Sequence, residues 1–177
     1  MENRRDPLVI EGSPAMTHAT HSSSHATPGH MGESHYRHLL IMTLLSFVAM
    51  YVLMYAMVDA FANVYNNLNQ FYMAGVMTAS MVVIELGVMR GMYHDKRLNM
   101  LIAAASIVAL IIFWLFIRQQ VAIGDRQFLR SMIPHHAGAI LMCQQTSARD
   151  AEIQQLCQNI ISGQQKEIDQ MKAKLDD

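Results

Sequence analysis

Charge is scarce in this sequence of 177 residues, because Asp, Glu, Lys and Arg make up 15% of it while hydrophobic residues make up 52%. Lys and Arg form no dense stripe and the formal net charge is −1, so nothing favours binding of nucleic acid. Two cysteines are too few for a disulfide framework. No short apolar stretch with a small-residue cleavage site precedes the first long hydrophobic segment, which argues against a secretory signal peptide. A chain with little charge and concentrated apolar runs is typical of a membrane protein.

The sequence also lacks the arrangement of acidic residues that holds the two metal ions of a di-metal enzyme. A ferritin-like di-metal oxidase needs several inward-facing Glu residues and Glu-x-x-His pairs on a helical bundle. After residue 118 the chain contains Glu152 and Glu167 but no Glu-x-x-His pair. We therefore expect no enzymatic activity.

Three apolar runs predict a membrane domain over residues 38–118. Each run is long enough to cross a hydrocarbon layer of about 30 Å as an α-helix. We therefore expect transmembrane helices at about residues 39–58, 71–92 and 98–117.

Charges at the ends of these runs predict how the protein lies in the membrane. The loop after the second run contains Arg90, Lys96 and Arg97, whereas residues 59–70 contain no Lys or Arg. Because basic loops remain cytoplasmic, we expect a multi-pass protein of the plasma or inner membrane, with the amino terminus inside and the carboxyl-terminal segment outside. Three basic residues near or after the end of the third run oppose this orientation: Arg118, Arg126 and Arg130.

Residues 1–37 lack an apolar run and are rich in Pro, Gly, Ser and Thr, which predicts a disordered tail. Histidines recur along this tail at irregular intervals. Such a tract can collect metal ions without folding, or it can be a solvated linker, and both readings stay open. The histidines are His18, His21, His25, His30, His35 and, at the junction, His38.

Residues 125–177 have the composition of a helical hairpin. Its first helix should cover residues 125–146 with a kink at Pro134, because proline lacks an amide proton. Ser147-Ala-Arg-Asp150 resembles a capping box, which predicts the start of the second helix. A hairpin of this size buries too little apolar area to be stable alone. We expect it to form homo-oligomers or to dock on the membrane helices.

The second helix of the hairpin should bury one face. Apolar residues recur along it at steps of three and four, which is typical of a one-sided amphipathic helix. They are Ile153, Leu156, Cys157, Ile160, Ile161, Ile168, Met171 and Leu175.

Soft and borderline metal ligands concentrate between Met132 and Cys143. On a helix, Met132 shares a face with His135 and His136, while Met142 and the thiol of Cys143 lie two turns further on, and all five are candidate metal ligands. Sulfur ligands favour Cu(I), whereas imidazole suits several metals, so this mixture favours copper over zinc. Adjacent imidazoles diverge by about 100°, so both can bind one ion only if another helix or chain completes the site. The alternative is a structural role for both histidines.

Four further residues are weaker candidate ligands: Met77, Met81 and Glu85 in the second run, and Met171 in the hairpin. Packing in lipid explains the methionines, and a strict four-residue spacing drifts by about 40° per step. An acid within a membrane span is costly and usually faces a partner, a cavity or an ion path. The first run carries a tighter methionine stripe, for which packing is again the favoured explanation: Met50, Met54 and Met57.

The two cysteines, Cys143 and Cys157, are expected on the buried faces of the hairpin helices, where core packing is the default for a free thiol. A disulfide is disfavoured, because a turn near Ser147 offsets their levels by roughly three residues, or about 4.5 Å of helical rise. The sequence leaves open whether both are free.

Several motifs occur together after the third run: Phe128-Leu-Arg-Ser-Met-Ile-Pro-His-His-Ala-Gly-Ala-Ile140, Asp150-Ala-Glu-Ile153, Ile160-Ile161 and Gln165-Lys-Glu-Ile-Asp-Gln-Met171. Through them the segment from Asp125 to Leu175, under a third of the chain, resembles the family called domain of unknown function 305. This resemblance implies a ferritin-like fold and an association with copper or silver. We therefore expect an all-α protein, with three transmembrane helices followed by a ferritin-like helical hairpin.

The ligands and the resemblance together favour a membrane-anchored protein that binds Cu(I) for homeostasis, buffering or handover. A copper-conducting membrane oligomer is an alternative, because the MxxxM step of the second run is similar to that of the eukaryotic copper transporter family. A non-catalytic assembly module is a further alternative. The expected partners are membrane lipid and other copies of the chain, bound through the hairpin, while the metal donor or acceptor is open.

Overall fold

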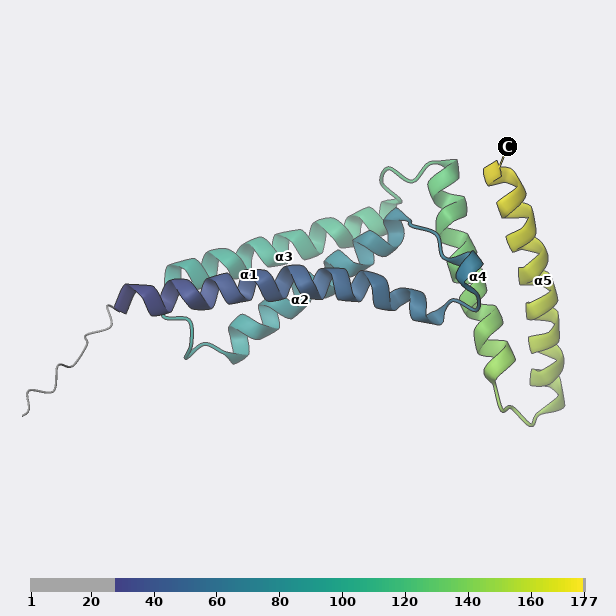
Figure 1. Ribbon diagram of the computed structural model, residues 1–177, viewed down its shortest axis with the longest axis horizontal. Coiled ribbons are helices and arrows are strands. Elements are labelled where there is room, and N and C mark those ends of the chain that lie inside the picture. The colour runs from purple at the N-terminus through teal and green to yellow at the C-terminus, as the bar shows by residue number, and fades with distance from the viewer. Residues whose placement is uncertain (1–27, 177) are drawn as a thin grey trace, which may run out of the picture.

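The computed structural model describes residues 28–176, with side chains from residue 35 onward. Within these residues the chain forms five α-helices, two short 3₁₀ helices and no strand (Figure 1). The all-α prediction is therefore confirmed for the described part of the chain. The helices are α1 (Pro28–Leu53), η1 (Met54–Met57), η2 (Phe61–Asn63), α2 (Leu68–Val88), α3 (Lys96–Gln119), α4 (Asp125–Gln145) and α5 (Ala151–Asp176).

Three helical segments are long and apolar enough to cross a membrane, as predicted, and they cover His35–Met57, Leu68–Val88 and Lys96–Gln119. The helix of the first span begins at Pro28, so the predicted tail is helical over its last residues. The helix of the second span ends at Val88, short of the predicted residue 92, because the chain then turns back toward α3. Four tail histidines lie outside the described side chains: His18, His21, His25 and His30.

Side-chain caps set where the second and third spans begin. The Asn67 side chain accepts a hydrogen bond from the backbone N of Gln70 at 2.9 Å, so α2 begins ahead of the predicted residue 71. The Asp95 carboxylate accepts hydrogen bonds from the backbone N atoms of Arg97 and Leu98 at 2.9 and 3.0 Å. The third span therefore also begins ahead of its predicted start at residue 98.

The second span packs against both other spans (Figure 1). A Cβ atom on Gly75 would lie 2.6 Å from Cδ2 of Phe113 on α3, so only glycine allows this close approach. Toward α1, the Thr78 hydroxyl donates a hydrogen bond to the Met50 sulfur at 3.6 Å. Small residues are accordingly prominent among the buried positions of α2, at Ala74, Gly75, Thr78 and Ala79.

The last two helices form a hairpin with its own apolar core, made of Ile133, Ala137, Ile140, Ile168, Met171 and Leu175. The Asp150 carboxylate accepts a hydrogen bond from the backbone N of Glu152 at 2.8 Å, so α5 begins at Ala151 with Asp150 as its cap, three residues later than the predicted capping box at Ser147 implies. α4 continues through the buried Pro134. The predicted apolar face of α5 is only partly covered, because Ile153 is 47% exposed and Leu156 is 57% exposed near the turn.

The hairpin docks on the end of the membrane bundle through α4, which contacts α2, η1 and η2, while α5 packs on α4 (Figure 1). The Gln127 side chain accepts a hydrogen bond from the backbone N of Leu68 at 3.2 Å, which ties α4 to the start of α2. Val58 and Tyr65, between the first two spans, pack against the hairpin core. Docking on the membrane helices, one of the two predicted ways to stabilise the hairpin, is thus confirmed.

Candidate metal-binding site

His136 lies in the middle of α4 and is buried, with 8% of its surface exposed. Its Nδ1 atom is 2.9 Å from the carbonyl oxygen of Met132, and its Nε2 atom is 2.8 Å from Oε2 of Glu167 on α5. Both neighbours are acceptors, so a ring protonated on both nitrogens satisfies both contacts at once. A metal ion at Nε2 would have to displace or share the Glu167 carboxylate. The structure therefore gives His136 a role in joining the two hairpin helices.

His135, by contrast, is exposed on α4. Its ring centroid is 6.1 Å from that of His136, and the two ring planes are inclined by 63°. The predicted divergence of the two imidazoles is confirmed. Among the residues that the structure describes, no three His, Cys, Asp or Glu side chains are close enough to hold a metal ion. A metal site built on His135 would therefore need donors of another kind, and thioether sulfur is the kind that the sequence offers nearby.

The predicted thioether ligands have different surroundings. Met132 is half-buried against the hairpin core, and Met171 belongs to that core with 9% of its surface exposed. Both are thus placed as packing side chains. Met142 is 56% exposed and stays accessible to a ligand.

The structure adds Met57 to the candidate ligands. In the sequence, its spacing in a methionine stripe had indicated a role in packing. A Cβ atom on Gly138 would lie 3.4 Å from the carbonyl oxygen of Met57 and 4.0 Å from its Cβ, so η1 rests directly on α4 at this glycine. Gly138 lies one turn after His135 and one turn before Met142, on the same helix face. Met57 is itself 56% exposed. Met57 therefore meets the face of α4 that carries the exposed His135 and Met142, and the place of Gly138 in the family motif was the only signal for this contact.

Cys143 on α4 and Cys157 on α5 are both free, and the Cys157 thiol lies close enough to Cys143 to affect its pKa. This contact, followed by partial burial, raises the pKa of Cys143 above its ordinary value. The predicted offset does not keep the thiols apart, because helical side chains tilt toward the helix amino terminus. Cys157 therefore leans toward the turn and Cys143 leans away from it. The two thiols form a second group of soft donors, on the side of α4 that faces α5.

The three weaker candidate metal ligands of the second span have different surroundings. Met77 is 42% exposed on the membrane-spanning surface, whereas Met81 packs against the apolar cluster around Leu86. Glu85 accepts a hydrogen bond from the Tyr93 hydroxyl at 3.2 Å. The different surroundings of the two methionines follow from the drift of a four-residue spacing around a helix.

Comparison with known proteins extends the resemblance beyond the hairpin. The family described as "Domain of unknown function (DUF305)" matches residues 12–175, which include all three spans. A relative, "Uncharacterized protein L153" of Acanthamoeba polyphaga mimivirus, is 34% identical over 142 residues, covering 78% of this chain and 91% of that protein. No solved structure matches the chain. The chain belongs to the DUF305 family.

Proposed function

We propose that this protein is a membrane-anchored copper-binding protein, in which the docked hairpin binds Cu(I) for homeostasis, buffering or handover. The observation that carries the proposal is the contact of Met57 with α4 at Gly138, between His135 and Met142. This contact brings Met57 to the face of α4 that carries His135 and Met142; all three residues are exposed, and they come from two segments far apart in the sequence.

The chemistry of these donors favours a soft monovalent ion. Thioether sulfur binds Cu(I) well and binds Mg²⁺, Ca²⁺ or Mn²⁺ poorly, because those hard ions prefer oxygen. The methionine side chain has three rotatable bonds, so the Met57 and Met142 sulfurs can turn toward a shared ion near His135. A site made from neutral donors also holds Cu(I) without burying a carboxylate.

Competition for Cu(I) with a chromogenic chelator, on the purified full-length protein, tests the proposal. Replacing His135 by Ala, or Met57 or Met142 by Leu, should each weaken Cu(I) binding by about ten-fold or more. Met-to-Leu changes nearly conserve side-chain volume, so the packing is largely preserved. Met100→Leu is the matched control, because Met100 is 72% exposed on α3 away from the hairpin. Unchanged affinity in all three site variants would contradict the proposal.

A non-catalytic assembly module is the second candidate, and the exposed turn end of the hairpin favours it. Three large apolar side chains stand open to solvent there, at Met142, Ile153 and Leu156. An exposed apolar patch of this kind is typical of a surface that binds another protein, and a second copy of the hairpin would cover it. Sedimentation of the detergent-solubilised protein with and without copper separates the two candidates. Copper-independent oligomers that Ile153→Gln with Leu156→Gln dissociates would favour assembly.

The proposal includes a hairpin outside the plasma or inner membrane, with the amino terminus in the cytoplasm. What supports it is that the basic loop with Arg90, Lys96 and Arg97 lies at the end of the bundle opposite the hairpin (Figure 1). Labelling of Cys143 and Cys157 in intact cells by a membrane-impermeant maleimide tests the orientation. Labelling only after the cells are lysed would place the hairpin inside.

A further inference from the structure

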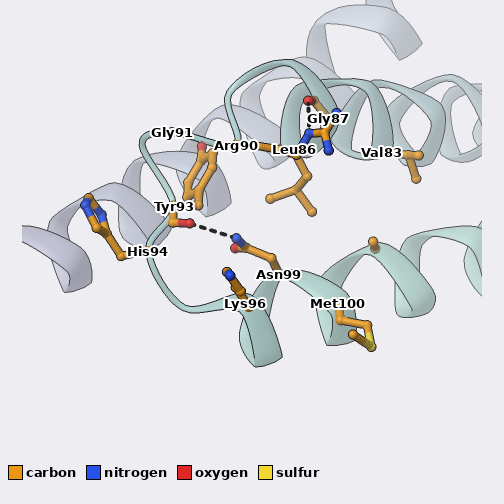
Figure 2. Close-up of a pocket in the computed structure, with 11 residues that line it drawn as sticks. Val83, Leu86, Gly87, Arg90, Gly91, Tyr93, His94, Lys96, Asn99 and Met100 are labelled. Carbon is orange, nitrogen blue, oxygen red and sulfur yellow. Dashed lines mark hydrogen bonds between the residues drawn. The ribbon is translucent and has the colours of Figure 1, made fainter.

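A cavity of about 630 Å³ lies between the end of α2 and the beginning of α3 (Figure 2). The turn that joins these helices is at the end of the bundle away from the hairpin (Figure 1). Its apolar wall comes from the membrane-spanning helices and includes Val83, Leu86, Met100 and Ala103. Because the second span ends at Val88 and the third begins at Lys96, the cavity lies at the boundary between lipid and water.

The water-facing rim of the cavity is basic. Arg90 and Lys96 line it together with His94. The Nε atom of Arg90 donates a hydrogen bond to the carbonyl oxygen of Gly87 at 3.1 Å, which fixes the side chain and leaves the ends of its guanidinium group for a ligand. No ion pair within residues 35–176 involves Arg90 or Lys96. The nearby Asp95 carboxylate is engaged in capping α3.

Hydrogen bonds among the polar residues of the turn hold the cavity open. The buried Tyr93 donates from its hydroxyl to Oε1 of Glu85 at 3.2 Å. Burial raises the pKa of Tyr93, and the Glu85 carboxylate adds to this shift, so the hydroxyl keeps its proton and continues to donate. The Asn99 side chain donates to the carbonyl oxygen of Tyr93 at 2.9 Å (Figure 2) and accepts from the Tyr36 hydroxyl at 2.7 Å. These groups satisfy one another, so a ligand meets mainly the cationic groups of the rim.

We propose that this cavity binds an anionic phospholipid, with its phosphate at Arg90 and Lys96 and its acyl chain along the apolar wall. Basic pockets between transmembrane helices suit anionic headgroups, and arginine matches phosphate oxygens with two parallel hydrogen bonds. A free phosphate ion would use the rim but not the wall. A second copy of the chain would bring its own basic rim, and the two basic rims would repel each other. The proposal rests on different residues from those of the copper site.

Native mass spectrometry of the full chain in detergent, after addition of phosphatidylglycerol or phosphatidylcholine, tests the lipid site. We expect preferential retention of phosphatidylglycerol. Arg90→Gln combined with Lys96→Gln should weaken this retention by about thirty-fold, the loss expected for two charges that face a lipid headgroup. Arg118→Gln combined with Arg149→Gln is the matched control, because it removes the same charge at the other end of the molecule and should retain the lipid.

A second variant separates lipid from free phosphate. Ala103→Phe fills the cavity but leaves the basic rim, so it should weaken phosphatidylglycerol retention by about ten-fold without changing the binding of inorganic phosphate. Equal retention of the two lipids, or full retention by the variant without Arg90 and Lys96, would overturn the proposal. Displacement of phosphatidylglycerol by an equal concentration of inorganic phosphate would overturn it in favour of a free anion. If the variant without Arg90 and Lys96 retains the lipid but no longer forms dimers, the proposal is overturned and the cavity binds a second copy of the chain.

Discussion

The Nε2 atom of His136 lies 2.8 Å from Oε2 of Glu167, and this contact joins the middle of α4 to α5. The side chain of His136 is 11% exposed and that of Glu167 is 59% exposed. Water therefore screens the carboxylate, and the contact contributes modestly to stability. Its importance lies in orientation, because it holds one of the two adjacent histidines inside the hairpin while His135 stays outside.

Replacing His136 by Ala should lower the free energy of local unfolding of the hairpin by about 1–2 kcal/mol, since the change removes a hydrogen bond to a charged partner. Hydrogen–deuterium exchange of the α4 and α5 amides in the full-length protein measures this quantity separately from the spans. Glu167→Gln keeps an acceptor and should cost less. His135→Ala is the control and should change exchange little, so equal effects of the two histidine variants would contradict a linking role for His136.

Gly138 should determine whether Met57 reaches the candidate copper site. An alanine Cβ there would make an ordinary van der Waals contact at 3.4 Å from the Met57 carbonyl oxygen, so Gly138→Ala should retain Cu(I) affinity. A leucine has no room beyond its Cβ, so Gly138→Leu should push η1 away and weaken Cu(I) binding by about ten-fold. Chelator competition measures both variants. A Gly138→Leu protein with unchanged affinity would exclude Met57 as a ligand.

Gly75 should be essential to the packing of the second span on the third. A Cβ atom there would lie 2.6 to 2.8 Å from three ring atoms of Phe113, so Gly75→Ala should destabilise the membrane domain by about 1–3 kcal/mol. Thermal unfolding in detergent, followed by circular dichroism, gives the measurement. Gly87→Ala on the same helix is the control, because a Cβ there meets nothing within 4 Å. The double variant Gly75→Ala with Phe113→Leu should be nearly as stable as Phe113→Leu alone, because the smaller side chain leaves room for the new Cβ. If the double variant is no closer to that stability than Gly75→Ala is to the wild type, the clash is not the cause.

The alkylation rate of Cys143 should depend on Cys157. Their contact raises the pKa of Cys143, so less of this thiol is ionised at neutral pH and its reaction with iodoacetamide is slow. In Cys157→Ala the pKa should fall toward its ordinary value, and the rate-versus-pH curve of Cys143 should move to lower pH. Mass spectrometry of the modified peptide over a pH series reports this curve. Superimposable curves for the two proteins would show that the thiols do not interact in solution.

The structural features that depend on residues close together in the sequence were predictable. The three spans follow from apolar length, and a second hairpin helix near Ser147-Ala-Arg-Asp150 was also predictable, although Asp150 and not Ser147 caps it. The second and third spans begin a few residues before the positions predicted from hydropathy, because the side chains of Asn67 and Asp95 cap their helices there. The divergence of His135 and His136 also followed from helical geometry alone.

The residues that meet across the molecule were not predictable in this way. Nothing local links Met57 to Gly138, because their contact requires α4 to dock on the end of the first span. The contact between Cys143 and Cys157 likewise depends on the opposite tilt of side chains on two antiparallel helices. The sequence by itself determined the spans, the hairpin and the kinds of candidate ligand, because hydropathy, capping and donor chemistry are properties of short segments. Only the tertiary structure decided which candidate ligands are accessible and which helices meet, because both depend on how the helices pack.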